Sequence, residues 1–197
     1  MISGCATKPD NTPEDINHIA TSHQRAAQLL NNKKWRLNGK IAFIQQTKGK
    51  SKRESASITW QVNENNKTQE LNLTSYLGIN VLHLQSNNGQ HLIKVDGEEY
   101  QGNNLSNLIY SLTGLTLPTQ ALNFWLKGLP YKTEDKLQLN EKTQLPKRIT
   151  SFYHNTTWQI DYNKYQRFNG LFMATQFTIK KDDLLIKIAV KNWSFLD

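Results

Sequence analysis

The stretch that decides the fold of this chain is Leu71–Leu84, which reads LNLTSYLGINVLHL. On each side of a central turn the residues alternate between apolar and polar, as in the two arms of a half-buried β-hairpin. The turn itself is unusual, because hairpin tips are normally polar, whereas here Tyr76 and Leu77 stand beside Ser75 and Gly78. Two interpretations of Leu77 follow: it folds back onto the core, or it faces outward toward an apolar partner.

The length and composition indicate one folded domain. The chain has 197 residues, of which 10% are aromatic; this is enough for a sizeable core and is unlike a disordered composition. The net charge of +8 would permit an anionic partner. The basic residues are scattered, however, and no basic run exceeds two residues. We therefore interpret the charge as a general property of the surface and expect no nucleic-acid partner.

Alternation continues through most of the chain and predicts further strands. The clearest is Ser55–Val62, in which Ile58 and Trp60 share one face while serine, threonine and glutamine share the other. Gly39 lies inside another predicted strand and suggests a bulge or a close approach of two backbones. Residues 49–53 are expected to form a polar turn. Outside the hairpin, strands are expected at residues 35–46, 55–62, 90–95, 148–153, 158–162, 174–180 and 184–191.

Three short helices are predicted from apolar residues that recur with a helical period. The first begins at Pro13, after the N-cap residue Thr12, and places His23, Ala27 and Leu30 on one face. The second and third are expected at residues 105–112 and 121–127.

The order of these elements favours one antiparallel sheet. Strands and helices do not alternate as βαβ units, so a doubly wound parallel sheet is not expected. A large antiparallel sheet with one apolar face must cover that face, and the aromatic residues exceed what three short helices need. We therefore expect a mainly β fold of the α+β class, in which residues 13–197 form a single domain. Its sheet is expected to be a curved or incompletely closed barrel around an apolar cavity.

Motifs for catalysis or cofactor binding are absent from the sequence. It contains no P-loop, GxGxxG, HExxH or GxSxG pattern, and its five histidines lack the spacing of metal ligands. His83 and His91 could meet across adjacent strands, although a solvent-facing pair is favoured. Glu98–Glu99 and Asp182–Asp183 are interpreted as turn residues. We therefore expect no enzyme activity, no cofactor and no metal site.

Cys5 is the only cysteine, and its context suggests lipid modification. Ile2–Cys5 reads ISGC and resembles the lipobox of bacterial lipoproteins, in which small residues precede the acylated cysteine. The residues before Cys5 lack the charged and apolar regions of a signal peptide, so most of that peptide is expected to be absent and this form to be soluble. Residues 1–12 are expected to be a lipobox remnant and a flexible tether. Ala6 implies, by the same resemblance, sorting to the outer membrane.

Five segments together resemble the LolB family of outer-membrane lipoprotein receptors. The central helical region reads LTGLTLP and then FWLKGLP, and the hairpin carries a Leu77-Gly78 tip. The family pattern has proline before this leucine, whereas this chain has Tyr76, a departure that leaves the loop apolar. The segments follow the order of the family and cover the chain from about Gln24 to Trp193. They are Leu37–Phe43, Leu71–Leu84, Leu112–Pro118, Phe124–Pro130 and Ile186–Trp193.

The resemblance implies a fold and a function. LolB-like proteins are open antiparallel half-barrels, with short helices over the mouth of an apolar cavity. By this resemblance the chain accepts the acyl chains of lipoproteins from the periplasmic carrier LolA and inserts those lipoproteins into the inner leaflet of the outer membrane. It would act as a monomer on the periplasmic face of that membrane, held there by a lipid on Cys5. Tyr76, Leu77 and Gly78 would form the membrane-insertion loop.

The apolar faces of the predicted strands and helices also give candidate contacts for acyl chains. A solid core without a cavity remains an equal alternative for each strand residue. An apolar-ligand-binding or structural outer-membrane lipoprotein without a handover role remains the alternative function. The candidate cavity residues are Ile58, Trp60, Leu71, Leu73, Leu82, Leu84, Leu108, Leu112, Trp125 and Trp158.

Overall fold

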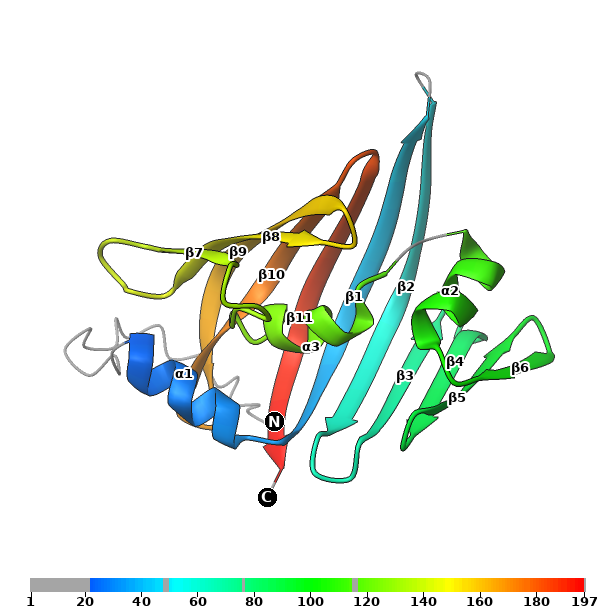
Figure 1. Ribbon diagram of the computed structural model, residues 1–197, viewed down its shortest axis with the longest axis horizontal. Coiled ribbons are helices and arrows are strands. Elements are labelled where there is room, and N and C mark those ends of the chain that lie inside the picture. The colour runs from blue at the N-terminus through cyan, green and yellow to red at the C-terminus, as the bar shows by residue number, and fades with distance from the viewer. Residues whose placement is uncertain (1–21, 48–49, 76, 115–116, 197) are drawn as a thin grey trace, which may run out of the picture.

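The fold is one strongly curved antiparallel sheet with helices on its concave side (Figure 1). The computed structural model describes residues 22–47, 50–75, 77–114 and 117–196. Within these residues the helices are α1 (Ser22–Asn31), α2 (Leu105–Thr113) and α3 (Thr119–Trp125). The eleven strands are β1 (Lys34–Thr47), β2 (Lys50–Asn63), β3 (Thr68–Thr74), β4 (Asn80–Asn87), β5 (Gln90–Val95), β6 (Glu98–Gly102), β7 (Lys136–Leu139), β8 (Pro146–Tyr153), β9 (Thr156–Phe168), β10 (Leu171–Lys181) and β11 (Leu184–Leu196).

The first and last strands lie side by side in the middle of the sheet. The strand order is β6-β5-β4-β3-β2-β1-β11-β10-β9-β8-β7, and every neighbouring pair is antiparallel. Lys34 is therefore opposite Leu196, although the two residues lie near opposite ends of the sequence. In Figure 1, α3 crosses in front of the central strands and α2 lies over the β3–β5 side. The predicted fold class, a mainly β open half-barrel with short helices, is confirmed.

Alternation places the apolar residues of each strand on the concave face. On β2, Ile58 and Trp60 are buried, whereas Ser57 and Gln61 on the opposite face are exposed. Neighbouring strands repeat this pattern in register, with Trp60 opposite Leu71. Burial of this one face supplies the hydrophobic driving force for the fold.

The buried residues form two separate clusters. The larger cluster lies along the seam of β1 and β11, where the ring centres of Trp35 lie 5.5 Å from Trp60 and 5.7 Å from Trp193. It also includes α3 and the strands of the β8–β10 side. The smaller cluster lies beneath α2 and consists of Leu84, Ile93, Leu105 and Ile109. The two helices that cover the sheet are therefore packed on different cores.

Two expected turns differ from the structure. Residues 50–53 were expected in a polar turn but begin β2, because two long neighbouring strands continue their pairing beyond the buried region. Glu98 and Glu99 lie in the edge strand β6 rather than in a turn; the turn is Asp96–Gly97, where both residues have positive φ. The turn expected at Asp182–Asp183 is confirmed.

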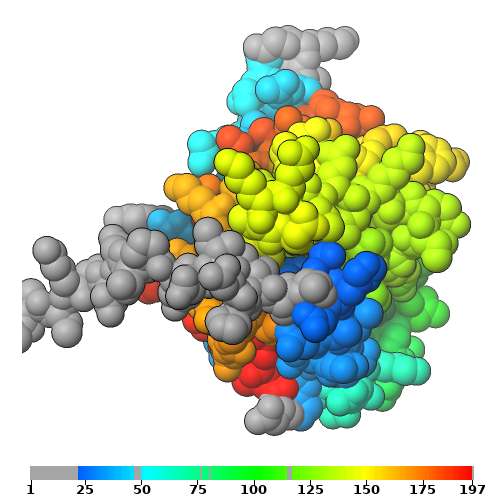
Figure 2. Space-filling model, turned by 90° about the vertical axis from the view of Figure 1, so that its left-hand side faces the viewer, coloured from blue at the N-terminus to red at the C-terminus, as the bar shows by residue number. Residues whose placement is uncertain are grey.

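The face assigned to the N-terminal helix is also wrong. His23, Ala27 and Leu30 are exposed, and the buried residues of α1 are Arg25 and Leu29. Arg25 can be buried because its guanidinium is satisfied by hydrogen bonds from Nε and Nη2 to two backbone carbonyl oxygens, at 2.8 and 3.0 Å. Burial lowers the pKa of this guanidinium. Figure 2 shows α1, in blue, below the segment around β7 and β8. The predicted part of this helix before Ser22, the tether and Cys5 lie outside the described residues.

Gly39 lies at a close approach of β1 to β11. The register shifts between Asn38 and Gly39, so the ladder is irregular at this point. A Cβ atom at Gly39 would lie 2.2 Å from the carbonyl oxygen of Ala189 and 2.9 Å from the Cα of Val190. Backbone atoms cannot move aside as the end of a side chain can, so only glycine fits here.

We predict that Gly39→Ala lowers the free energy of unfolding by about 2 kcal/mol or more, because the added methyl group forces the central strands apart. Chemical denaturation measures this loss. Gly102→Ala is the matched control: its Cβ would meet only Leu108 Cδ1, at 4.0 Å, and it should be neutral or stabilising by up to about 1 kcal/mol. Equal stability of the two variants would contradict the close approach at Gly39.

Candidate functional site: an apolar cavity with a polar mouth

An apolar cavity of about 480 Å³ lies between the concave face and the helices α2 and α3. Its floor includes two rows of side chains that run across the four paired strands β2–β5. Residues of β1, β10 and β11 also line the cavity: Ile41, Phe43, Ile179, Leu184, Ile186 and Ile188. Seven of the ten predicted residues line it: Ile58, Trp60, Leu71, Leu73, Leu82, Leu84 and Leu112. The rows are completed on β5 by Ile93 and Val95. This volume falls within the range of about 300–1,000 Å³ that small-molecule ligands occupy.

The helices supply the other wall. Ile109 and Leu112 come from α2, and Leu122 and Leu126 come from α3 and its C-terminal end. Both helices turn their apolar faces toward the sheet, as their sequence period predicts. The cavity therefore lies at the border between the two packed clusters.

Three predicted residues do not line this cavity. Trp125 and Trp158 are packed against each other with ring centres 5.9 Å apart, inside the larger cluster. Both side chains are part of the solid core. A hydrogen bond of 3.3 Å from Trp125 Nε1 to Asp135 stabilises this arrangement further. Leu108 packs against the smaller cluster and does not line the cavity. For Trp158 the alternative of a solid core describes the structure, and Trp125 belongs to the same filled core.

The tip of the β3–β4 hairpin presents apolar side chains to solvent. Leu77 is 79% exposed and Ile79 is 64% exposed, so Leu77 does not fold back onto the core. The loop is closed by hydrogen bonds from the Ser75 N–H to the Ile79 carbonyl and from the Gly78 N–H to the Ser75 carbonyl. Gly78 has a φ of +78°, which favours glycine. Tyr76 lies outside the described residues.

A second, polar pocket of about 590 Å³ opens between α2, α3 and the β8–β9 turn. The sequence interpretation missed it; the density of asparagine around the two helices was the available signal. None of its lining residues is Lys, Arg, Asp or Glu. They are Gln69, His91, Asn103, Asn104, Leu105, Ser106, Asn107, Tyr110, Thr119, Gln120, Asn123, Tyr153 and His154.

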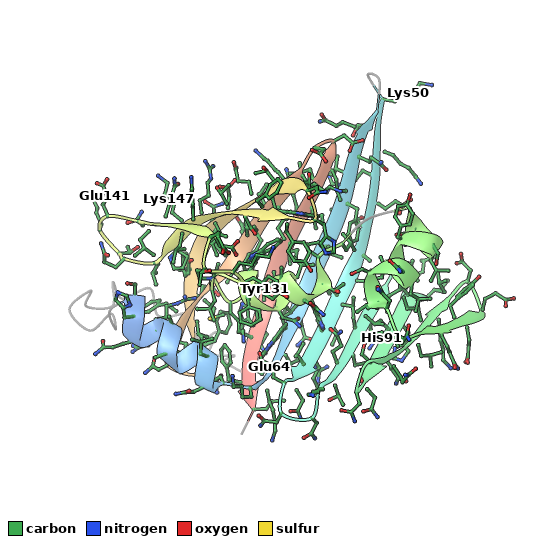
Figure 3. The ribbon with its side chains drawn as sticks, viewed as in Figure 1. Lys50, Glu64, His91, Tyr131, Glu141 and Lys147 are labelled. Atoms are coloured by element: carbon green, nitrogen blue, oxygen red, sulfur yellow. The ribbon has the colours of Figure 1, made fainter. Side chains whose placement is uncertain are left out.

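A row of hydrogen-bonded side chains separates the apolar floor from this polar pocket. Trp60 Nε1 donates to Gln69 Oε1 at 3.3 Å, and Gln69 Nε2 donates to Ser86 Oγ at 3.3 Å. Ser86 Oγ in turn lies 2.7 Å from His91 Nδ1 (His91 is labelled in Figure 3). Partial burial lowers the pKa of His91, which favours the neutral form of its imidazole.

The two histidines considered as a pair are not brought together. His83 is opposite Lys94 and hydrogen-bonds Asn72, whereas His91 is opposite Ser86. Within the described residues, no group of three His, Cys, Asp or Glu side chains could hold a metal ion. No helix in the described ranges has the length and apolar character needed to cross a membrane.

The end of α3 is held in place by buried polar contacts. Lys127, which is 1% exposed, lies 2.7 Å from Glu64 Oε1 at the β2–β3 turn; Glu64 is labelled in Figure 3. Tyr162 donates its hydroxyl to the carbonyl of Trp125 at 2.7 Å, and Arg25 donates to the carbonyl of Lys127. Burial raises the pKa of Tyr162 well above its usual value. The cavity wall formed by α3 is therefore held in a defined position.

Comparisons with known proteins agree with this geometry. Residues 33–193 match the model of the family described as outer membrane lipoprotein LolB. A protein named outer-membrane lipoprotein LolB from Aeromonas salmonicida is 32% identical, over 98% of this chain and 91% of its own length. A protein of the same name from Tolumonas auensis is 30% identical, again over 98% of this chain and 91% of its own length. Among solved structures, a LolA superfamily protein from Nitrosomonas europaea has a TM-score of 0.52, with 8% identity, 87% of this chain covered and 94% of that one.

We predict that Glu64→Gln lowers the free energy of unfolding by about 3 kcal/mol, because it leaves the buried Lys127 ammonium without a counter-charge. The measurement is denaturant unfolding at pH 7. Glu99→Gln is the control: its pair with Lys94, at 2.5 Å, is about half exposed on each side, and its loss should cost less than about 1 kcal/mol. If the two substitutions cost the same, the Lys127–Glu64 contact does not hold α3.

Proposed function

Because the chain belongs to the LolB family of outer-membrane lipoproteins, we propose that it accepts acylated lipoproteins from the periplasmic carrier LolA and inserts them into the outer membrane. The apolar cavity between the sheet and α2 and α3 holds the acyl chains during this transfer. The tip at Leu77 and Gly78, with Tyr76, then promotes their release into the bilayer. We assign no catalytic role to the protein.

The observation that carries this proposal is the combination of a cavity and an exposed apolar tip in one small domain. Exposure of an acyl chain to water costs roughly 0.8 kcal/mol of free energy for each methylene group. A cargo with several acyl chains therefore needs an apolar cavity. The two rows on the cavity floor, which begin at Ile58 and Trp60 on β2 and end at Val95 and Ile93 on β5, consist of apolar side chains. Leu77 and Ile79, exposed at the tip, are suited to contact lipid.

The direction of transfer follows from relative affinity. A ligand moves between two proteins only as far as its difference in binding free energy allows. The cavity must therefore hold acyl chains more tightly than LolA does and less tightly than the bilayer. A lipid on Cys5 would keep this monomer on the periplasmic face of the outer membrane, close to the final acceptor; several acyl chains hold a protein there firmly, whereas one does so only marginally.

The alternative is an outer-membrane lipoprotein that binds an apolar ligand without handing it over. A storage protein has no need of an apolar hairpin tip in solvent, because only its cavity contacts the ligand. The exposure of Leu77 and Ile79 therefore favours the transfer function.

We predict that Leu73→Asp weakens binding of an acylated peptide by more than about tenfold, because it places a carboxylate on the cavity floor. Displacement of a fluorescent fatty acid from the purified protein measures this. Leu137→Asp, at a position on the edge strand β7 that does not line the cavity, should bind as the parent does. Unchanged binding by a folded Leu73→Asp protein would refute the cavity as the acyl site.

We predict that Leu77→Glu leaves stability within about 0.5 kcal/mol of the parent, since exposed substitutions rarely cost more. The variant should still receive lipoprotein from LolA, because the cavity is intact. It should deliver poorly to liposomes, because contact of one leucine with an apolar phase is worth roughly 1.5–3 kcal/mol.

The matched control for this variant is Phe152→Glu, since Phe152 is 66% exposed on β8 in the other half of the sheet. That substitution removes a comparable exposed apolar group and should deliver normally. Normal delivery by Leu77→Glu, or equal loss in both variants, would show that the tip has no specific role.

A further inference from the structure

We propose that the polar pocket between α2, α3 and the β8–β9 turn binds the first, uncharged residues of the cargo polypeptide that follow its acylated cysteine. This inference rests on the proposed function, since it assigns the part of the cargo that the apolar cavity cannot accept. The pocket would fix the orientation of the cargo and contribute affinity that depends on its peptide.

The two cavities adjoin each other, as such a ligand requires. Gln69 and Thr119 line both of them, one from β3 and the other from the first turn of α3. A molecule whose acyl chains lie on the apolar floor therefore has its polar end beside the polar pocket. In an acylated lipoprotein, that polar end is the backbone after the modified cysteine.

The side chains of the pocket match a peptide backbone. Carboxamides such as those of Asn107, Gln120 and Asn123 each carry donors and an acceptor, as does every peptide unit. Asn123 Oδ1 is buried and has no hydrogen-bond partner among the described residues. Buried acceptors are normally paired, and a rotation of the Asn123 side chain, which lines the pocket, would let this oxygen accept an N–H of the cargo.

The lack of Lys, Arg, Asp and Glu in the pocket lining disfavours charged ligands. A phospholipid head group carries a phosphate, which needs Lys or Arg nearby, and the lining contains neither. Its two histidines are His91, whose pKa is lowered by partial burial, and His154, which is stacked against Tyr153 with ring centres 4.2 Å apart. An uncharged peptide is therefore the ligand that this lining fits best.

The test compares three probes that share one lipid part. The first is a triacylated cysteine amide, the second adds a neutral Ser-Ser-Asn-Ala tail, and the third replaces two tail residues with aspartate. The wild-type protein should bind the neutral-tailed probe about tenfold more tightly than the tail-less probe, the gain expected from one or two net hydrogen bonds. The acidic tail should increase the affinity over that of the tail-less probe by less than the neutral tail does.

Two variants and one control then locate this gain in the pocket. Asn123→Leu should lose the preference for the neutral tail while it binds the tail-less probe as the parent does. Asn107→Lys, an exposed position on α2, should bind the acidic tail about two- to fivefold more tightly than the parent does, as expected for an exposed ion pair. Asn163→Leu, exposed on β9 outside both cavities, should change neither preference.

The outcomes separate this inference from the proposed function. If no probe binds, the proposed function fails; if all three bind equally to the wild type, only the peptide pocket fails. The inference would also be overturned if Asn123→Leu kept the preference for the neutral tail and Asn107→Lys did not bind the acidic tail more tightly than the parent. So would stronger competition by phosphatidylglycerol in the wild type than in Asn123→Leu, since it would identify a lipid head group as the occupant.

Discussion

The constraint on which this structure depends is that one sheet must cover its own apolar face. All eleven described strands belong to a single sheet, so no second sheet packs against it as in a sandwich. Curvature covers part of the face, and helices must cover the rest. The described helices that pack on the sheet are short: the longest, α1, has ten residues and is therefore only about 15 Å long. The area that neither curvature nor helix covers remains open, and this remainder is the cavity.

The two halves of the sheet meet this constraint differently. On the side of β8–β11, tryptophan and tyrosine side chains fill the space, and Trp125, Trp158 and Trp193 are almost fully buried. On the side of β2–β5, the inward residues are mostly leucine and isoleucine; together with aliphatic residues of β10 and β11 such as Ile179 and Ile186, they leave a void between the sheet and the helices. Side-chain volume therefore decides where the protein is solid and where it is hollow, although both halves follow the same alternating pattern.

That distinction explains what the sequence could and could not predict. Alternation identifies which residues face inward, so the class of the fold and most strands were predictable, including β5 with its bounds. It cannot separate a cavity wall such as Leu73 from filled core such as Trp158, because both are inward and apolar. The edge strand β6 was missed since it is mostly exposed on both faces. Arg25 was missed because its burial depends on carbonyl groups more than a hundred residues away. The polar pocket was missed because its lining also comes from segments that are distant in the sequence, from Gln69 to His154.

The pairing of β1 with β11 also determines when the chain can fold. The central ladder joins the first described strand to the last, so its contacts have the greatest sequence separation of any strand pair in the described residues. Folding rates fall as contact order rises, and sheets of this kind fold in milliseconds to seconds. Trp35 cannot meet Trp193 until the final strand has been synthesised. An emerging chain therefore cannot complete its central core before β11 has been synthesised, and until then the apolar residues of β1 can be bound by chaperones.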